Sequence, residues 1–333
     1  MKILIDAFGG DHAPKEIIKG AIDALKNNPD IKIVLSGKQD IISKELENYE
    51  FDLDRIEILD APEVISNDEQ PTLAIREKKE SSLVKGLYRL KEDSDIAAMV
   101  SAGSTGAFLT GAMLIVGRLE GIDRPALAPV LPTLTYGNTM LIDSGANMDC
   151  KPEYLVQFAV MGSAYMQAVH NIETPKVALL SVGTEDEKGN AQTKAAFELL
   201  KKAPINFVGN MEARDALSGD YDVLVADGFA GNILLKSIEG TVNMILSALK
   251  QSIMERTLSK IGAALMKPSF KKLKERLDYN KMGGAPFLGC KKIVIKTHGS
   301  SKAESIAAAI LQAQTMAKMG LIEKIKSGLE KIV

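Results

Sequence analysis

The chain contains no tryptophan, only two cysteines and few aromatic residues. Aromatic residues make up 5% of its 333 residues, which leaves little of the stacking surface used to bind single-stranded nucleic acid. Cys150 and Cys290 lie far apart in sequence and lack the paired spacing of a zinc site. Two distant thiols in a chain of this length favour a reducing compartment over a disulfide-linked secreted domain.

Long hydrophobic runs and a strong charge imbalance are also absent. No run reaches about 18 consecutive apolar residues, so no transmembrane helix is predicted. The first residues, MKILIDAFGGDH, enter a strand pattern at once and lack the apolar stretch and cleavage site of a signal peptide. The formal net charge is −2, so no overall field attracts nucleic acid and any basic surface must be local. We therefore expect a cytoplasmic protein without a nucleic-acid partner.

Several sequence motifs of nucleotide and hydrolase sites are missing. The chain has no G-x-x-x-x-G-K-[ST] segment, no G-x-G-x-x-G after its first strand and no G-x-S-x-G turn. These absences disfavour a P-loop nucleotide hydrolase, an ordinary dinucleotide-binding fold and a serine hydrolase. No cluster of histidine and cysteine residues indicates zinc, and no metal or cofactor is expected.

Short apolar runs alternate with helical patterns along the whole chain. Most runs are rich in Val, Ile and Leu without alternation, which is typical of strands buried on both faces of a largely parallel sheet. Amphipathic patterns predict helices at residues 14–27 and 71–90, each opened by a proline, so an α/β layered fold is expected. The runs are Ile3–Ile5, Ile31–Leu35, Ile56–Leu59, Ile96–Val100, Met140–Ile142, Val177–Val182, Val223–Ala226 and Ile293–Ile295.

One stretch has no strand pattern. Residues 231–281 are helical in character, with Pro268 interrupting the pattern. We predict an αα-hairpin that projects from the sheet, with its tip between Leu258 and Phe270. Residues 251–281 hold eight basic residues against three acidic ones, although the whole chain is slightly acidic.

Glycines and small polar residues follow six of the predicted strands. Glycines let the backbone approach an anion closely, and the N–H groups of a first helical turn favour negative charge. Turns at the carboxyl ends of parallel strands meet at one edge of a sheet, so together they could hold phosphate or a developing oxyanion. The turns are Asp6–His12, Ser101–Ala107, Asp143–Asn147, Gly183–Asn190, Asp227–Asn232 and His298–Lys302.

The order of these turns resembles the PlsX-type acyl-[acyl carrier protein]:phosphate acyltransferases of phospholipid synthesis. The resemblance spans the chain and includes DAFGGDHAP at residues 6–14, SAG-x-TGA at 101–107, Gly283–Pro286 and His298–Ser301. It implies transfer of an acyl chain from acyl carrier protein to inorganic phosphate, a fold related to isocitrate and isopropylmalate dehydrogenases, and a homodimer on the inner face of the cell membrane. The product would pass to a downstream glycerol-3-phosphate acyltransferase.

We expect one catalytic unit with a three-layer α/β/α architecture and two lobes. The first lobe is predicted at about residues 1–130 and 291–333, and the second at about 131–290, with the helical hairpin at about 231–282.

The predicted mechanism needs no covalent intermediate, because phosphate is a nucleophile and a thiolate leaves readily. The phosphate is assigned to the turn Ser101–Ala107, aided by Thr105 and Lys236, while Asn147 and Asn232 donate to the thioester oxygen and His298 or His12 holds a proton. Carboxylates at strand ends commonly accept backbone N–H bonds and hold their turns. The full set of predicted substrate-binding residues is Asp6, Gly9, Gly10, Ser101, Gly103, Ser104, Thr105, Gly106, Asp143, Gly183, Asp227, Gly228, Gly231, Gly299 and Ser300.

Three residues have a structural interpretation beside a functional one. His298 and His12 could each be hydrogen-bonded structural residues, and Cys150 could be a nucleophile or, as is commoner for cysteine, a buried thiol.

The hairpin tip combines basic and apolar residues that suit an anionic bilayer or an acidic carrier protein, and a dimer interface is the alternative. The predicted contact residues are Leu258, Ile261, Leu265, Met266, Lys267, Lys271 and Lys272.

Other functions fit the same pattern of turns. A phosphotransacetylase-like enzyme acting on acyl-coenzyme A needs the same anion cleft. A metal- and NAD-dependent β-decarboxylating dehydrogenase would need an arginine cluster, but Arg76, Arg118 and Arg124 are dispersed. A non-catalytic lipid-binding module would show no phosphate-dependent loss of thioester.

Overall fold

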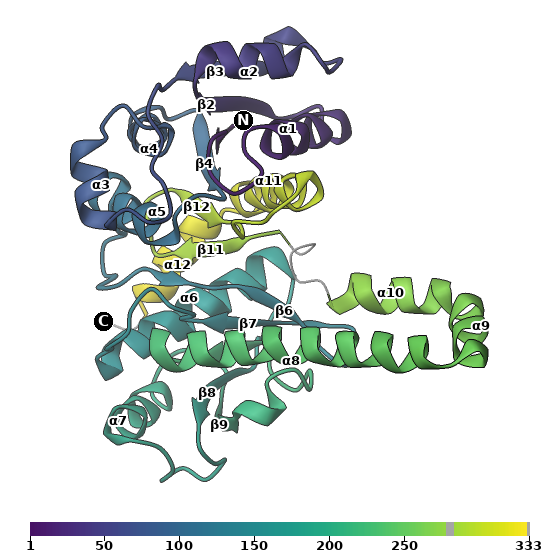
Figure 1. Cartoon of the computed structure of the whole chain (residues 1–333). Coiled ribbons are helices and arrows are strands. Elements are labelled where there is room, and N and C mark those ends of the chain that lie inside the picture. The colour runs from purple at the N-terminus through teal and green to yellow at the C-terminus, as the bar shows by residue number, and fades with distance from the viewer. Residues whose placement is uncertain (278–282, 332–333) are drawn as a thin grey trace.

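The computed structural model of the chain describes residues 1–277 and 283–331. Two β-sheets form the centres of two lobes, and helices flank both (Figure 1). Most strand pairs are parallel, and helices cover both faces of each sheet, so the predicted α/β fold with three layers is confirmed. The division into two separate sheets is a detail that the apolar runs alone do not indicate.

The first lobe contains a seven-stranded sheet, in which β11 pairs antiparallel with both of its neighbours. Alternate residues of β1 face opposite sides, so that Ile3 and Ile5 enter one core cluster and Leu4 another. The order of the strands is β3 (Ile56–Asp60), β2 (Lys32–Gly37), β1 (Lys2–Asp6), β4 (Ile96–Ser101), β12 (Ile293–Lys296), β11 (Ala285–Leu288) and β5 (Ala126–Leu127).

Helices cover both faces of this sheet. The helix α1, which buries Ile17, Ile18 and Ile22, packs with α11 over Ile3 and Ile5, and α4 and α5 cover the opposite face. A π-helical turn at Ala112–Val116 extends α5 without a break. The helices of this lobe are α1 (Lys15–Asn27), α2 (Gln39–Leu46), α3 (Pro71–Glu77), α4 (Ser82–Glu92), α5 (Thr105–Gly111) and α11 (Ala303–Lys318), with a short 3-10 turn at Leu53–Arg55.

The second lobe contains a five-stranded sheet. Helices α6 and α7 pack on one face with Val177 and Val223, and the first turns of α8 pack on the other with Leu141 and Leu224. The strands run in the order β6 (Val130–Pro132), β7 (Asn138–Ile142), β10 (Val223–Val225), β8 (Val177–Ser181) and β9 (Phe207–Glu212). The helices are α6 (Pro152–Val169), α7 (Ala191–Leu200), α8 (Gly228–Glu255) and α12 (Leu321–Leu329), with a 3-10 turn at Ala213–Asp215.

The predicted hairpin is present and projects from the two lobes (Figure 1). Its first arm is α8, its tip is α9 (Thr257–Leu265), and α10 (Lys267–Leu277) runs back toward the lobes. Pro268 lies in the first turn of α10, where its missing N–H is not needed. The predicted end of the hairpin near residue 282 lies outside the described residues. None of the helices in the described part of the chain has the length and apolar character needed to span a bilayer.

Three predicted boundaries need correction. The helix predicted at residues 71–90 is two helices, because Ser81 caps α4 with its hydroxyl and interrupts the pattern. Strand β11 pairs with β12 in the first sheet, so the predicted end of the second lobe at residue 290 is too late. Helix α12 packs against α6, which brings the end of the chain onto the second lobe, although residues 291–333 were assigned to the first.

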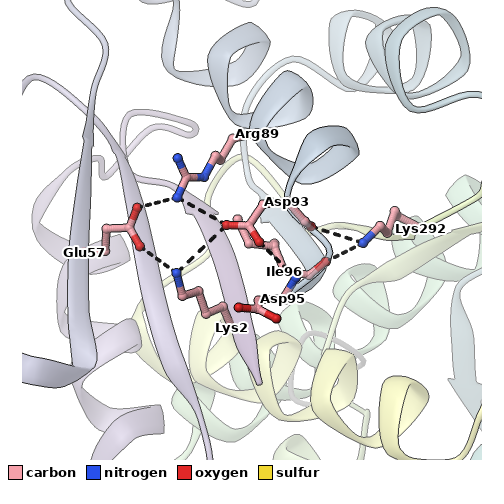
Figure 2. A network of polar contacts seen from close by, with 7 residues as sticks. All are labelled: Lys2, Glu57, Arg89, Asp93, Asp95, Ile96 and Lys292. Carbon is pink, nitrogen blue, oxygen red and sulfur yellow. Dashed lines mark hydrogen bonds and ion pairs between the residues drawn. The ribbon is translucent and has the colours of Figure 1, made fainter.

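A network of ion pairs joins the amino-terminal ends of the strands in the first sheet (Figure 2). Lys2 contacts Glu57 at 3.0 Å, and Arg89 contacts Glu57 at 2.9 Å and Asp93 at 3.2 Å. Lys292 donates to two backbone carbonyl groups just before and at the start of β4. These partly exposed pairs hold strand starts together, and they lie at the edge of the sheet opposite the glycine-rich turns.

Candidate functional site

The turns after β1, β4 and β12 lie side by side. These three strands are parallel neighbours in the first sheet, so their carboxyl ends meet at one edge. The backbone N–H of Asp11 donates to the carbonyl oxygen of Gly299 at 2.8 Å. A Cβ at Gly9 would lie 2.6 Å from the nitrogen of Gly103, so only glycine permits this close approach.

Asp6 holds two of these turns together. Its carboxylate accepts hydrogen bonds from the Ser101 hydroxyl at 2.7 Å and from the Phe8 N–H at 3.3 Å. Ser101 in turn accepts the N–H of Gly103 at 3.1 Å. Burial raises the pKa of Asp6. These contacts match the structural role expected of strand-end carboxylates.

The turn after β4 positions the start of α5. The Ser104 hydroxyl accepts the N–H of Ala107 and caps the helix, which leaves the exposed Thr105 at its first turn. Gly106 packs against the Pro71 ring, where a Cβ would lie 2.6 Å from Cγ. The first turn of α5 is therefore fixed between its cap and α3, with Thr105 facing the cleft described below.

The turn after β7 is built around Asp143. Its carboxylate accepts N–H groups from Leu127 at 3.0 Å and from Asn147 at 2.7 Å, and burial raises its pKa. The side-chain amide of Asn147 donates to Asp143 at 2.9 Å and to the carbonyl oxygen of Pro125 at 2.8 Å. Both N–H bonds of that amide are thus used inside the turn, so Asn147 cannot also donate to a thioester oxygen as predicted.

The turn after β10 packs directly on the Asp143 turn. Asp227 caps α8 by accepting the N–H of Ala230 at 2.7 Å. A Cβ at Gly228 would lie 2.6 Å from the carbonyl oxygen of Asn147, and one at Gly231 only 1.9 Å from that of Asp143. These two glycines therefore permit close packing of the helix on the turn, and their contact with a ligand stays a prediction.

A cleft of about 230 Å³ lies between the two lobes, and both sets of turns contribute to it. Thr105, His298 and Gly299 come from the first lobe, and Ser144 and Lys236 come from the second. Gly283 and Gly284, which follow the hairpin, also line it. The remaining lining residues are Leu127, Pro129, Val130, Leu235, Glu239, Ala285, Lys296 and Thr297.

The charged groups of this cleft differ in exposure. Lys236 is exposed and contacts Glu239 at 2.8 Å, one turn further along α8. Lys296 is buried, and burial lowers its pKa to about 8. Lys296 and Thr297 are absent from the predicted site, because a lysine that ends an apolar strand resembles an ordinary strand end in sequence.

His298 is held by its own turn. Its Nδ1 accepts the N–H of Ser300 at 3.2 Å and lies 2.8 Å from the Ser300 hydroxyl. A backbone N–H can only donate, so the neutral ring carries its proton on Nε2. His298 can therefore present an N–H in the cleft, and Ser300 positions the ring.

Asn232 lies beside the Asp143 turn, with its side chain next to Gly145. Its amide has no hydrogen-bond partner among residues 1–277 and 283–331, so it keeps two N–H donors at the start of α8, one turn before Lys236.

Four other residues lie away from the cleft lining. His12 and Gly10 belong to the turn after β1, which contacts Gly299 from outside. The Cys150 thiol donates to the carbonyl oxygen of Asn147, and burial raises its pKa to about 12, which suits a structural thiol and not a nucleophile. Gly183 belongs to the turn after β8, which borders a different cavity.

That second cavity is apolar and measures about 440 Å³. Leu180 and Val182 border it from the end of β8, and Phe229 and Ile233 from the first turns of α8. Ile233 and Ser237, which line it, lie on the face of α8 opposite to Leu235 and Glu239, which line the first cleft. The six predicted turns therefore do not share one hollow. The turns Ser101–Ala107, Asp143–Asn147 and His298–Lys302 line the cleft, whereas Gly183–Asn190 and Asp227–Asn232 border the second cavity, and Asp6–His12 lines neither of these two spaces.

Comparisons with known proteins place this chain in a family. The family model described as "Fatty acid synthesis protein" matches residues 1–324. A protein named phosphate acyltransferase from Clostridium tetani is 49% identical over 332 residues, which cover 100% of this chain and 99% of that protein.

Two solved structures show the fold. A phosphotransacetylase from Streptococcus pyogenes has a TM-score of 0.61 at 18% identity, covering 96% of this chain and 94% of that one. A protein from Salmonella typhimurium assigned as a 4-hydroxythreonine-4-phosphate dehydrogenase has a TM-score of 0.51 at 15% identity, covering 95% of this chain and 99% of that one. The chain therefore belongs to the fatty acid synthesis protein family, and over its full length it is similar to proteins named phosphate acyltransferase.

Proposed function

We propose that this chain transfers an acyl group from the thioester of acyl carrier protein to inorganic phosphate, yielding acyl phosphate and free carrier thiol. The observation that carries the proposal is the interlobe cleft, where the start of α5, two lysines and His298 lie around one space. The membership of the chain in the fatty acid synthesis protein family supports the same reaction class.

The chemistry needs positioning and charge stabilisation. An oxygen of phosphate attacks the thioester carbon, the new C–O bond forms, and the tetrahedral oxyanion then collapses with loss of the C–S bond to release thiolate. Phosphate is placed at the first turn of α5, with Thr105 and the lysines of the cleft. Asn232 offers its amide N–H to the oxyanion. The Nε2–H of His298 donates a hydrogen bond to the departing sulfur, and the proton given up by the attacking hydrogen phosphate converts the thiolate to thiol.

The helical hairpin is proposed to contact an anionic membrane surface. Leu258 and Leu265 are 83% and 81% exposed on α9, and Ile261 and Met266 are also exposed. Exposed lysines follow on α10, among them Lys267, Lys271 and Lys272. Apolar side chains beside cations suit the inner face of a cell membrane, where anionic headgroups attract cations.

The partners of the reaction belong to this proposal as well. We place acyl carrier protein at the mouth of the cleft and expect the chain to act as a homodimer. An acyl phosphate is a reactive anhydride, so it would be consumed by an acyltransferase acting on glycerol 3-phosphate at the membrane.

The test is phosphate-dependent release of carrier thiol, with the acyl phosphate trapped by hydroxylamine. Wild-type protein is expected to release thiol only when phosphate is present and to form hydroxamate in equal amount. Coenzyme A thioesters are compared in the same assay. Faster turnover with them would show that the acyl donor is acyl-coenzyme A and not acyl carrier protein. NADH formation from hydroxyacids without any thiol release would contradict the proposed function.

A further inference from the structure

Lys296 bridges two of the turns that form the cleft. It is the last residue of β12 and only 8% exposed. Its Nζ donates to the carbonyl oxygen of Ala102 at 3.2 Å and to that of Thr297. An ammonium has three N–H donors, so one of them has no protein partner among the described residues.

This buried cation lacks a counter-ion. Within the described ranges, no carboxylate lies within 4.0 Å of Nζ. Asp6 and Asp11 attract it only from farther away, and the Asp6 carboxylate is bound by Ser101. A buried unpaired charge is costly, and Lys296 lines the open cleft. An anion entering that cleft would supply the missing counter-charge.

The neighbouring Thr297 adds a second unused donor. The residue is 2% exposed and lines the same cleft, yet its hydroxyl has no hydrogen-bond partner in the described part of the chain. Buried polar groups are nearly always satisfied, so an orphan hydroxyl in a cleft wall indicates a missing partner. An ammonium next to a hydroxyl is a donor set that phosphate oxygens accept.

We propose that the Lys296 ammonium and the Thr297 hydroxyl bind the phosphate that attacks the acyl thioester. This inference rests on the proposed function and deepens it, because it names the groups that hold the nucleophile. Lys236 is exposed and paired with Glu239, so Lys296 is the inner cation of the cleft. Binding through the non-attacking oxygens leaves one oxygen of phosphate free to reach the thioester carbon.

The first test is the substitution Thr297→Val, which removes the hydroxyl and keeps the shape of the side chain. The substitution removes no hydrogen bond made within the described residues, so the melting temperature is expected to stay or rise. The KM for phosphate should increase roughly tenfold, the loss expected for one hydrogen bond to a charged group, while the KM for the carrier thioester stays constant.

Thr139 offers a matched control, because it is a buried threonine of β7 whose hydroxyl also lacks a partner among the described residues. It does not line the cleft, so Thr139→Val should leave the KM for phosphate unchanged. An unchanged KM for phosphate in Thr297→Val as well would overturn the proposal for this hydroxyl.

The second test is Lys296→Met, followed by calorimetric titration with inorganic phosphate in the absence of thioester. Binding of phosphate is expected to weaken at least about thirtyfold, as for the loss of a charged hydrogen-bond partner. An effect on the KM for the carrier thioester alone would place the ammonium against the carrier and overturn the proposal. If this variant does not fold, the KM for phosphate of Thr297→Val and the pH dependence of phosphate binding by the wild type test the proposal instead.

The pH dependence gives an independent measurement. Lys296 has a pKa of about 8, so the affinity of wild-type protein for phosphate should fall as the pH rises through that value. The charged groups that face it are Asp6 and Asp11 on neighbouring turns and Lys236 with Glu239 on α8, and the titratable ring of His298 lines the same cleft. Thr297→Val retains Lys296, so its affinity for phosphate should still fall near pH 8. The same fall in Lys296→Met would contradict the proposal that Lys296 binds phosphate.

The two proposals can fail separately. Wild-type protein that releases carrier thiol with phosphate, together with variants whose KM for phosphate is unchanged, would retain the function and reject the site. Protein that binds phosphate through Lys296 but releases no thiol would retain the site and reject the function.

Discussion

At the scale of single residues, the tightest contact in the site is between helix α8 and the turn after β7. Gly231 lies in the first turns of α8, directly against the carbonyl group of Asp143. Gly240 lies in the same helix with nothing within 4 Å of the position of its Cβ. The two glycines thus share a helix but differ in surroundings, which makes them a matched pair.

We expect Gly231→Ala to destabilise the fold by about 1–3 kcal/mol, because the added methyl group meets backbone that cannot move without shifting the turn. Gly240→Ala should stabilise it by roughly 0.5–1 kcal/mol, since alanine is the better helix former. Urea denaturation measures both. Equal effects of the two substitutions would show that the α8 contact with Asp143 is not tight.

The burial of Lys296 predicts how the free energy of unfolding changes with pH. Its folded pKa of about 8 lies below the ordinary value of 10.5, so burial disfavours its charged form. Below pH 8 both states carry the proton and the cost of burial is fully present. Between pH 8 and 10.5 the unfolded chain still binds the proton while the folded chain releases it, so stability rises.

The free energy of unfolding of wild-type protein, relative to Lys296→Met, should therefore increase by an amount on the order of 3 kcal/mol across this window. Denaturant titrations at pH 7.5 and 10.5 measure the difference between the two proteins. A constant difference would show that Lys296 has an ordinary pKa in the folded state.

The candidate site could be predicted only in part from the residues. The sequence indicates which turns carry glycine, and Thr105, Lys236, His298 and Gly299 do line one cleft. It cannot show which donors are already used. The sequence does not reveal that the side-chain amide of Asn147 already donates to Asp143 and Pro125. Nor does it reveal that Lys296, an ordinary strand-end lysine in sequence, lines the cleft.

At the scale of elements, strong apolar runs predict strands and weak ones do not. All eight predicted runs form strands. The Val, Ile and Leu side chains are buried in most of them, whereas those of the edge strand β3 are half-buried. The strands β5, β6, β9 and β11 were not predicted. β5 has two residues, β9 contains Gly209 with a positive φ and a register shift, and β11 contains Pro286. Such strands depend on their neighbours, so only the folded chain reveals them.

The helical hairpin yields a prediction at this scale. The double substitution of Leu258→Glu and Leu265→Glu adds two negative charges to the exposed tip, so binding to anionic liposomes should fall at least about tenfold. Turnover without liposomes should stay within about twofold, because α9 lies beyond the far end of α8 (Figure 1), whose Lys236 and Glu239 line the cleft. Vesicle co-sedimentation and the thiol assay measure the two properties.

A matched control adds the same charges elsewhere. Leu53 and Leu114 are 78% and 60% exposed on the first lobe, and Leu53→Glu with Leu114→Glu should leave liposome binding nearly unchanged. If the tip variant and this control bound liposomes equally, the hairpin would not be the membrane contact.

At the scale of the whole molecule, the two lobes share one apolar core. Ile306 on α11, Tyr165 on α6 and Ile325 on α12 belong to the same cluster of buried residues. The Tyr165 hydroxyl accepts the side-chain amide of Gln312 at 3.0 Å, which links α6 to α11 inside that core. The lobes therefore do not have independent interiors, although their sheets are separate.

We expect one cooperative unfolding transition for the wild-type chain, measured by calorimetry together with circular dichroism. Ile325→Ala removes a buried side chain where α12 meets α6, and should cost about 2–4 kcal/mol without changing the KM for phosphate. Two separate transitions in wild-type protein would show that the lobes unfold independently.

The length of helix α8 limits the distance between the reaction centre and a membrane surface at the hairpin tip. The helix runs without a break from Glu239 at the cleft to Glu255 next to the tip, which at 1.5 Å per residue is about 24 Å. If the tip rests on a bilayer, the reaction centre stays within roughly one such helix length of the surface at any tilt. A newly made anhydride then has only that short distance to travel through water, where it would otherwise hydrolyse.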